Sequence, residues 1–183
     1  DVSDPTSPAV LGSANTPGYA YGVFVSGDHA YVADETGGLQ VVDVSNPGSP
    51  VIVGSVALSS IARKVFVDGD HAFVANDAAG FRVVDVSDPT APILVATVNT
   101  PGSAHSVVVD GDHAFVADYD GGLRVFDVSD PTNPATIGTL ATSGLAEGVS
   151  VSGNRLYLAD RAGGFMMIDI TDPTAPAILQ TIA

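Results

Sequence analysis

The chain of 183 residues contains no cysteine and few basic side chains. The lack of cysteine excludes a disulfide framework, a thiol nucleophile and a Cys-ligated zinc site. Lys and Arg total only 6 against 21 Asp and Glu, so the formal net charge is −15. A nucleic-acid partner is not expected, because binding to phosphates needs basic patches. Insertion into a membrane is not expected either, because every apolar run is only a few residues long.

Glutamate is almost absent as well, since every acidic residue except Glu35 and Glu147 is an aspartate. Aspartate favours turns and glutamate favours helices, so this bias indicates a β protein with many turns. Hydrophobic residues make up 45% of the chain and charged residues 15%. A disordered acidic tail would be much poorer in apolar residues, so we expect a folded core.

The sequence repeats itself at a constant step of 42 residues. Asp-Val-Ser-Asp-Pro begins at Asp1, Asp85 and Asp127, and close variants begin at Asp43 and Asp169. A second motif, of the type Gly-Asp-His-Ala, recurs with the same step. The chain therefore divides into residues 1–15 and the repeats 16–57, 58–99, 100–141 and 142–183.

Each repeat contains four short runs rich in Val, Ile, Phe and Tyr, bounded by Gly, Pro and Asp. In the first repeat these runs cover 20–25, 29–33, 39–44 and 51–57, and they predict strands. Four strands in about 40–45 residues are typical of one β-propeller blade. The sequence predicts an all-β β-propeller with four blades of four antiparallel strands, plus one extra N-terminal strand over Ala9–Ala14.

The extra strand, the last strand of a preceding blade, is one more than a closed ring of four blades requires. We expect the chain to be an excerpt of a longer repeat protein or a self-assembling unit, with self-association or further blades as its partners. A ring of four blades, a ring of eight blades from two copies and an open array all stay open at this stage. An uncovered blade face would expose apolar residues, which favours association.

The third strand of each repeat ends in a recurring motif. These strands read Leu39-Gln-Val-Val-Asp43, Phe81-Arg-Val-Val-Asp85, Leu123-Arg-Val-Phe-Asp127 and Phe165-Met-Met-Ile-Asp169. Three of them are followed by Val-Ser-Asp-Pro or Val-Ser-Asn-Pro and the fourth by Ile-Thr-Asp-Pro, and all four repeats resemble the LVIVD repeat of bacterial and archaeal surface or secreted proteins. The resemblance implies a propeller fold and an extracellular or cell-surface location. It implies no catalytic residues.

Positions that are identical in all repeats are interpreted as structural. Asp43, Asp85, Asp127 and Asp169 end the third strand, and we expect each carboxylate to accept backbone N–H groups in the following turn. Three repeats also place a histidine at one equivalent position, but the fourth places Arg155 there. Equivalent positions on neighbouring blades point to different places around the ring, so no metal site and no cofactor are predicted.

Positions that differ between repeats gather on one face. Alternating strand direction places the loop before strand one and the loop after strand two on the same face of a blade. The candidate ligand-binding residues at these loops are Tyr19, Tyr21, Arg63, Lys64, His105, Glu147, Tyr119 and Arg161. They suit a small ligand or the end of a peptide. The competing interpretation is that exposed loops simply tolerate change.

The sequence contains no G-x-S-x-G, phosphate-binding loop or H-E-x-x-H motif. This absence, the repeat architecture and the extracellular setting that the family resemblance implies lead us to expect a non-enzymatic extracellular binding or scaffold module that recognises its ligand through the variable face. One alternative is a structural subunit of a fibre or surface layer. Another is an enzyme at the mouth of the central channel, with His105 and Glu147 as acid and base.

Overall fold

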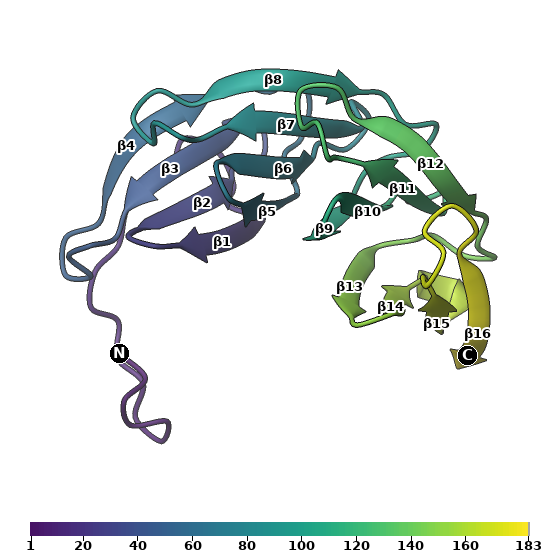
Figure 1. Cartoon of the computed structure of the whole chain (residues 1–183). Coiled ribbons are helices and arrows are strands. Elements are labelled where there is room, and N and C mark those ends of the chain that lie inside the picture. Colours follow the sequence, from purple (N-terminus) through teal and green to yellow (C-terminus); the bar gives the residue numbers. More distant parts are fainter. Residues whose placement is uncertain (183) are drawn as a thin grey trace.

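The computed structural model describes residues 1–182 as four antiparallel sheets of four strands each (Figure 1). Each sheet is one blade, its strands pair in chain order, and the first blade comprises β1 (Gly22–Ser26), β2 (His29–Ala33), β3 (Leu39–Asp43) and β4 (Val51–Val56). Blade two contains β5 (Lys64–Asp68), β6 (His71–Ala75), β7 (Phe81–Asp85) and β8 (Ile93–Val98). Blade three contains β9 (Ser106–Asp110), β10 (His113–Ala117), β11 (Leu123–Asp127) and β12 (Ala135–Leu140). Blade four contains β13 (Gly148–Ser152), β14 (Arg155–Ala159), β15 (Phe165–Asp169) and β16 (Ala177–Ile182), with the short 3-10 turn η1 (Arg161–Gly163).

The four blades form an open, propeller-type arc (Figure 1). The first strands β1, β5, β9 and β13 lie next to one another in that order, on the inner side of the arc. The fourth strands lie on the outer side, and blades one and four form its two ends (Figure 1). The predicted all-β fold, with one blade per 42-residue repeat, is confirmed.

The extra N-terminal strand over Ala9–Ala14 does not form, so that prediction was wrong in this detail. A fourth strand needs a third strand beside it, and residues 1–21 contain none. The segment still occupies the position of a fourth strand. Gly12 approaches the Pro47 backbone so closely that a Cβ added to Gly12 would lie 2.5 Å from the Pro47 carbonyl oxygen. A Cβ added to Gly54 would likewise lie 2.2 Å from the carbonyl oxygen of Pro89 in the following blade. Figure 1 shows that the residues before this contact extend away from blade one.

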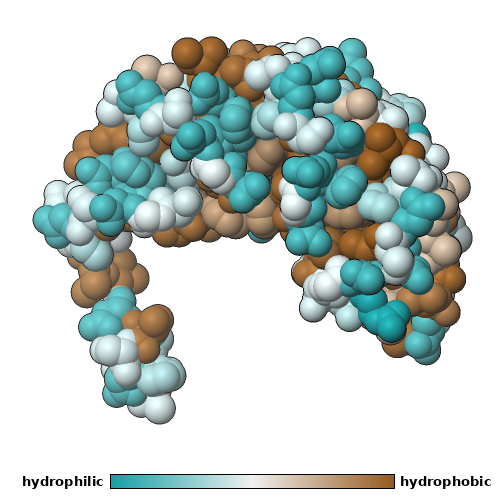
Figure 2. All heavy atoms as spheres, in the orientation of Figure 1, coloured by the Kyte–Doolittle hydropathy of each residue, from teal (hydrophilic) through white to brown (hydrophobic). Residues whose placement is uncertain are grey.

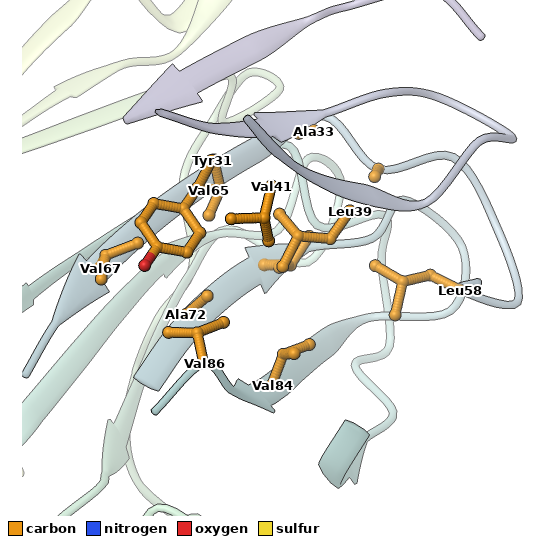
Figure 3. Packing of buried hydrophobic residues seen from close by; sticks show 12 residues of the cluster. Tyr31, Ala33, Leu39, Val41, Leu58, Val65, Val67, Ala72, Val84 and Val86 are labelled. Atoms are coloured by element: carbon orange, nitrogen blue, oxygen red, sulfur yellow. The ribbon is translucent and has the colours of Figure 1, made fainter. Parts of the chain in front are cut away.

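Apolar packing between blades forms the core. Tyr31, Leu39 and Val41 of blade one point toward Val65 and Val67 of blade two, and all five are at most 5% exposed (Figure 3). Equivalent clusters lie between blades two and three and between blades three and four. This packing explains why the third strands are nearly continuous in apolar residues, since a sheet covered on both faces has no polar side.

The constant aspartates end the third strands on the face that carries the turns after strands one and three, called the turn face below (residues 26–29, 43–50 and their counterparts). A carboxylate oxygen of Asp85 accepts the Ser87 N–H at 2.8 Å. Hydrogen bonds from the Ser87 hydroxyl and N–H lower the pKa of Asp85 below its ordinary value of 3.8. The same arrangement recurs at Asp43, Asp127 and Asp169.

These lowered pKa values make stability depend on pH. The hydrogen bonds favour the carboxylate in the folded state, so the aspartates stabilise the fold above their ordinary pKa of 3.8 and lose this contribution as pH falls through the lower folded pKa. The melting temperature should therefore fall below about pH 4. In the triple variant D43N/D85N/D127N the amide oxygens still accept but do not titrate, so circular dichroism melts should show a shallower acid loss. An unchanged pH profile would contradict the role of these carboxylates.

A second set of aspartates is fully buried at the end of strand two and ties the loop before strand one to its own blade. Asp160 accepts the Thr142 hydroxyl at 2.7 Å and the Gly144 N–H at 2.8 Å. Asp34 and Asp118 do the same with the matching threonine and glycine of their repeats. Burial raises the pKa of Asp118, although the Thr100 and Gly102 hydrogen bonds and Arg124 oppose the rise.

Blade two lacks these hydrogen bonds between the aspartate and the loop before strand one. Leu58 and Ser60 replace the threonine and glycine, and Asn76 replaces the aspartate. Ala79 replaces a glycine whose added Cβ would meet the aspartate side chain in blade one. As a result, neither polar atom of the buried Asn76 side chain has a hydrogen-bond partner within residues 1–182.

Two matched alanine variants test how much these aspartate hydrogen bonds contribute to stability. Asp160→Ala leaves a partly buried hydroxyl and N–H unpaired and should lower the free energy of unfolding by about 1–3 kcal/mol. Asn76→Ala removes an amide that has no partner and should change it by less than about 1 kcal/mol. Urea unfolding followed by circular dichroism measures both values. Equal losses would show that the aspartate hydrogen bonds do not stabilise the blade.

Candidate functional site

A row of polar side chains crosses three blades on the face opposite the turn face. This loop face comprises residues 16–22, 33–39 and their counterparts. Arg63 Nε donates to Asp77 Oδ1 at 3.1 Å, and His105 Nε2 lies 3.4 Å from the same oxygen. Asp77 therefore joins the arginine of its own blade to the histidine of the next blade.

The row continues from blade three to blade four. His105 Nδ1 lies 3.4 Å from Glu147 Oε1, and Arg161 pairs with the same carboxylate oxygen. Arg161 Nη1 also donates to the Tyr119 hydroxyl at 2.8 Å, and its guanidinium carbon lies 4.9 Å from the centre of the Tyr119 ring. The His105 and Tyr119 ring centres are 4.5 Å apart, so Tyr119 contacts both neighbours in the row.

Exposure divides the row into an inner and an outer part. The His105 side chain is 9% exposed and that of Asp77 is 16% exposed, whereas Arg161 and Glu147 are 52% and 34% exposed. Tyr21 extends the row at the other end, because the Arg63 guanidinium lies 5.9 Å from its ring centre. The outer side chains can contact a ligand, while the inner pair holds them in place.

The backbone positions these side chains by an unusual conformation. Glu35, Asp77, Tyr119 and Arg161 occupy equivalent positions, and all have a positive φ of 39–49°. Residues other than glycine rarely adopt this left-handed conformation. At Asp77 it is stabilised by two backbone hydrogen bonds of 3.0 Å to Ala104 of the next blade. Glu35 and Tyr119 form the same paired bonds with Ala62 and Ala146.

The structure brings six of the eight candidate residues together: Tyr21, Arg63, His105, Tyr119, Glu147 and Arg161. Tyr19 and Lys64 are exposed beside the row, and neither forms a side-chain hydrogen bond or ion pair with any residue of the described chain 1–182. Asp77 was missed in the sequence. The signal that could have found it is charge, since Asp77 is an acidic residue at the position equivalent to Tyr119 and Arg161.

His105 and Glu147, the acid and base of the enzyme alternative, are in contact but are not isolated. Asp77 holds the second nitrogen of the imidazole, and Arg161 holds the glutamate. No group of three or more His, Asp or Glu residues within 1–182 is arranged to hold a metal ion. A cavity of about 270 Å³ lies on the turn face, between Asp70 and Asp112 of blades two and three, and is separate from the row.

The turns and third strands described above recur in every blade, and the model of the LVIVD repeat matches residues 1–16, 17–57, 60–100, 101–142 and 143–182. The chain belongs to the LVIVD repeat family. The match to 1–16 shows that the segment before blade one has a repeat sequence although it forms no strand.

Solved structures share the fold of this LVIVD-repeat chain. The crystal structure of the computationally designed Ika4 protein has a TM-score of 0.72 at 7% identity, covering 88% of this chain and 97% of that chain. The designed Ika8 protein has a TM-score of 0.69 at 9% identity, covering 84% of this chain, which spans only 46% of that chain. No protein of curated function matches the LVIVD-repeat chain in sequence. Within the described residues, no helix has the length and apolar character needed to span a membrane.

The exposed ion pair of the row should contribute little to stability. Glu147→Gln removes the charge that pairs with Arg161. The paired oxygen Oε1 is covered, but the Arg161 side chain is 52% exposed and that of Glu147 34%, so solvent still screens the charges. We expect the free energy of unfolding to change by less than about 1 kcal/mol. Urea unfolding beside Asp160→Ala measures the difference. A loss as large as that of Asp160→Ala would make the row a structural feature of the fold.

Proposed function

We propose that this LVIVD-repeat chain is a non-enzymatic, extracellular or cell-surface binding and scaffold module that recognises its ligand through the loop face. The observation that carries the proposal is the row itself. Four repeats place an aromatic, a guanidinium, an imidazole and a carboxylate at one equivalent position, and three of these, Arg63, His105 and Glu147, are linked with Asp77, Tyr119 and Arg161. The turns of the opposite face repeat nearly the same residues in each blade. A fixed frame with varied loops is typical of binding proteins.

The charge distribution supports an anionic ligand group at this face. Seven carboxylates of the four blades lie at the loop face, whereas twelve lie at the turn face, so the loop face is the less acidic of the two. Five of the six basic residues lie at the loop-face end of the blades: Arg63, Lys64, Arg82, Arg124 and Arg161. Arg63 and Arg161 also lie near tyrosine rings. Guanidinium groups beside aromatic rings bind carboxylates and flat groups well. The C-terminal carboxylate of a peptide is therefore the ligand group that we propose.

The scaffold part of the proposal rests on the two ends of the arc. Blades one and four each leave an apolar face exposed, which further blades or another copy of the chain can cover. An extracellular or cell-surface location is the setting that the family resemblance implies.

Binding to a peptide library tests the recognition proposal. We expect fluorescent hexapeptides with a free C-terminal carboxylate to bind, and the amidated forms of the same peptides to bind at least tenfold more weakly. The variant R63A/R161A should lose binding by a similar factor, because both guanidinium groups are removed from the loop face. Fluorescence anisotropy measures the dissociation constants.

Arg155→Ala is the matched control, because Arg155 is exposed on the turn face. It should bind the peptides as the parent chain does. Peptide binding that survives R63A/R161A would place recognition elsewhere. Peptides cleaved during the assay would contradict the non-enzymatic role.

A further inference from the structure

Blade one leaves uncovered the positions that the other blades bury. Val23 and Val25 of β1 are 56% and 60% exposed. Their counterparts Val65 and Val67 in blade two are 0% and 5% exposed, because the side chains of blade one cover them. The open face of blade one thus has the residues of a blade junction without a neighbour.

Blade four shows the complementary face. Phe165 is 43% exposed, although its counterpart Phe81 is fully buried. Tyr157 stacks on Phe165 with 5.9 Å between ring centres, just as Phe73 stacks on Phe81 at 6.1 Å inside the junction of blades two and three. Figure 2 shows hydrophobic atoms, in brown, on both limbs of the arc.

The backbone at both ends of the arc also matches that of the internal junctions. Arg161 adopts the left-handed conformation that, at the three internal junctions, accompanies two hydrogen bonds to an alanine of the next blade. The alanine of blade one at the equivalent position is Ala20, which is exposed. A partner that presents Ala20 to Arg161 would supply the bonds that stabilise this conformation elsewhere.

We propose that a second copy of this chain covers both faces, with blade four of each copy packed head to tail on blade one of the other. The second copy is the occupant because its two ends carry the same residue types that cover each other at the three internal junctions. Those junctions bury clusters of twelve, twelve and ten side chains, so two more of them would supply a large apolar contact. Two identical head-to-tail contacts close a two-copy ring of eight blades. The inference rests on the scaffold part of the proposed function.

The N-terminal segment competes with this contact. Gly12 lies against Pro47 and Pro50, at the place that strand four of a preceding blade takes in the internal junctions. Ala14 packs on the buried residues Ala30, Val32 and Val42 of blade one. The fourth strand β16 of a second copy would need the same place, so the segment must move aside when the copies join.

Light scattering coupled to size exclusion tests the proposal on the full chain. We expect a particle of twice 18.4 kDa at micromolar concentration that persists in high salt, because the contact is apolar. Val25→Asp and Phe165→Lys should each give a monomer without unfolding, since both side chains are already exposed in the single chain. Ile93→Asp is the matched control, because Ile93 is 61% exposed but lies on β8, away from both ends.

Mixing the two monomeric variants tests the head-to-tail arrangement. Val25→Asp keeps an intact blade four and Phe165→Lys keeps an intact blade one, so an equimolar mixture should restore a one-to-one complex through one contact. In Gly12→Val the new side chain meets the Pro47 backbone and pushes the segment away. We expect this variant to associate at least tenfold more tightly.

If both the parent chain and Gly12→Val stay monomeric up to 100 micromolar, the proposal is overturned. The open faces of blades one and four would then be left for further blades to cover. A mixture that stays monomeric would overturn the head-to-tail contact, and polymers that grow with concentration would overturn closure by two copies. A monomer that still binds peptides would contradict only this inference. A normal dimer without peptide binding would contradict only the recognition proposal.

Discussion

Every blade depends on apolar contact with its neighbours, because a four-stranded sheet with two apolar faces cannot bury either face by itself. Blade two has this contact on both sides. Phe73 and Val83 face blade three, Val65 and Val74 face blade one, and all are at most 3% exposed. Blade four has it on one side only, where Leu156 and Leu158 are buried. The chain is therefore a linear array whose stability comes from nearest-neighbour contacts.

The loop face depends on the same contacts. At the three internal junctions the left-handed residue of the variable loop pairs with an alanine of the next blade, so these loops take their positions from the blade junctions. Side chains as different as those of Asp77 and Tyr119 can therefore occupy one backbone position. In this arrangement the junction supplies the geometry, and the residue at each position supplies the chemistry of the row.

Much of the fold could be predicted because the 42-residue step fixes the strands of all repeats together. The prediction of a strand over Ala9–Ala14 was wrong because a strand needs a hydrogen-bonded neighbour, which composition and periodicity do not reveal. Six candidate site residues came together because their loops lie beside the first strands, on the inner side of the arc where adjacent blades are closest. Asp77 and the buried Asp34 were missed, since their roles depend on where the loops fold. Within residues 1–182 the Asn76 side chain has no hydrogen-bond partner, whereas the equivalent Asp34 has two. This difference follows from Leu58 and Ser60, and only the structure shows it.

The separation of the two faces also orders the charge of the molecule. Twelve of the 21 carboxylates lie in the turns of the four blades on one face, whereas five of the six basic residues lie toward the other. Such a distribution gives the arc an electric dipole that runs from the turn face to the loop face. The loop face, with seven carboxylates against five basic residues, therefore repels an anionic molecule much less than the turn face does. The repeated turns, whose local task is to end strands, thus also determine the direction from which a charged ligand approaches.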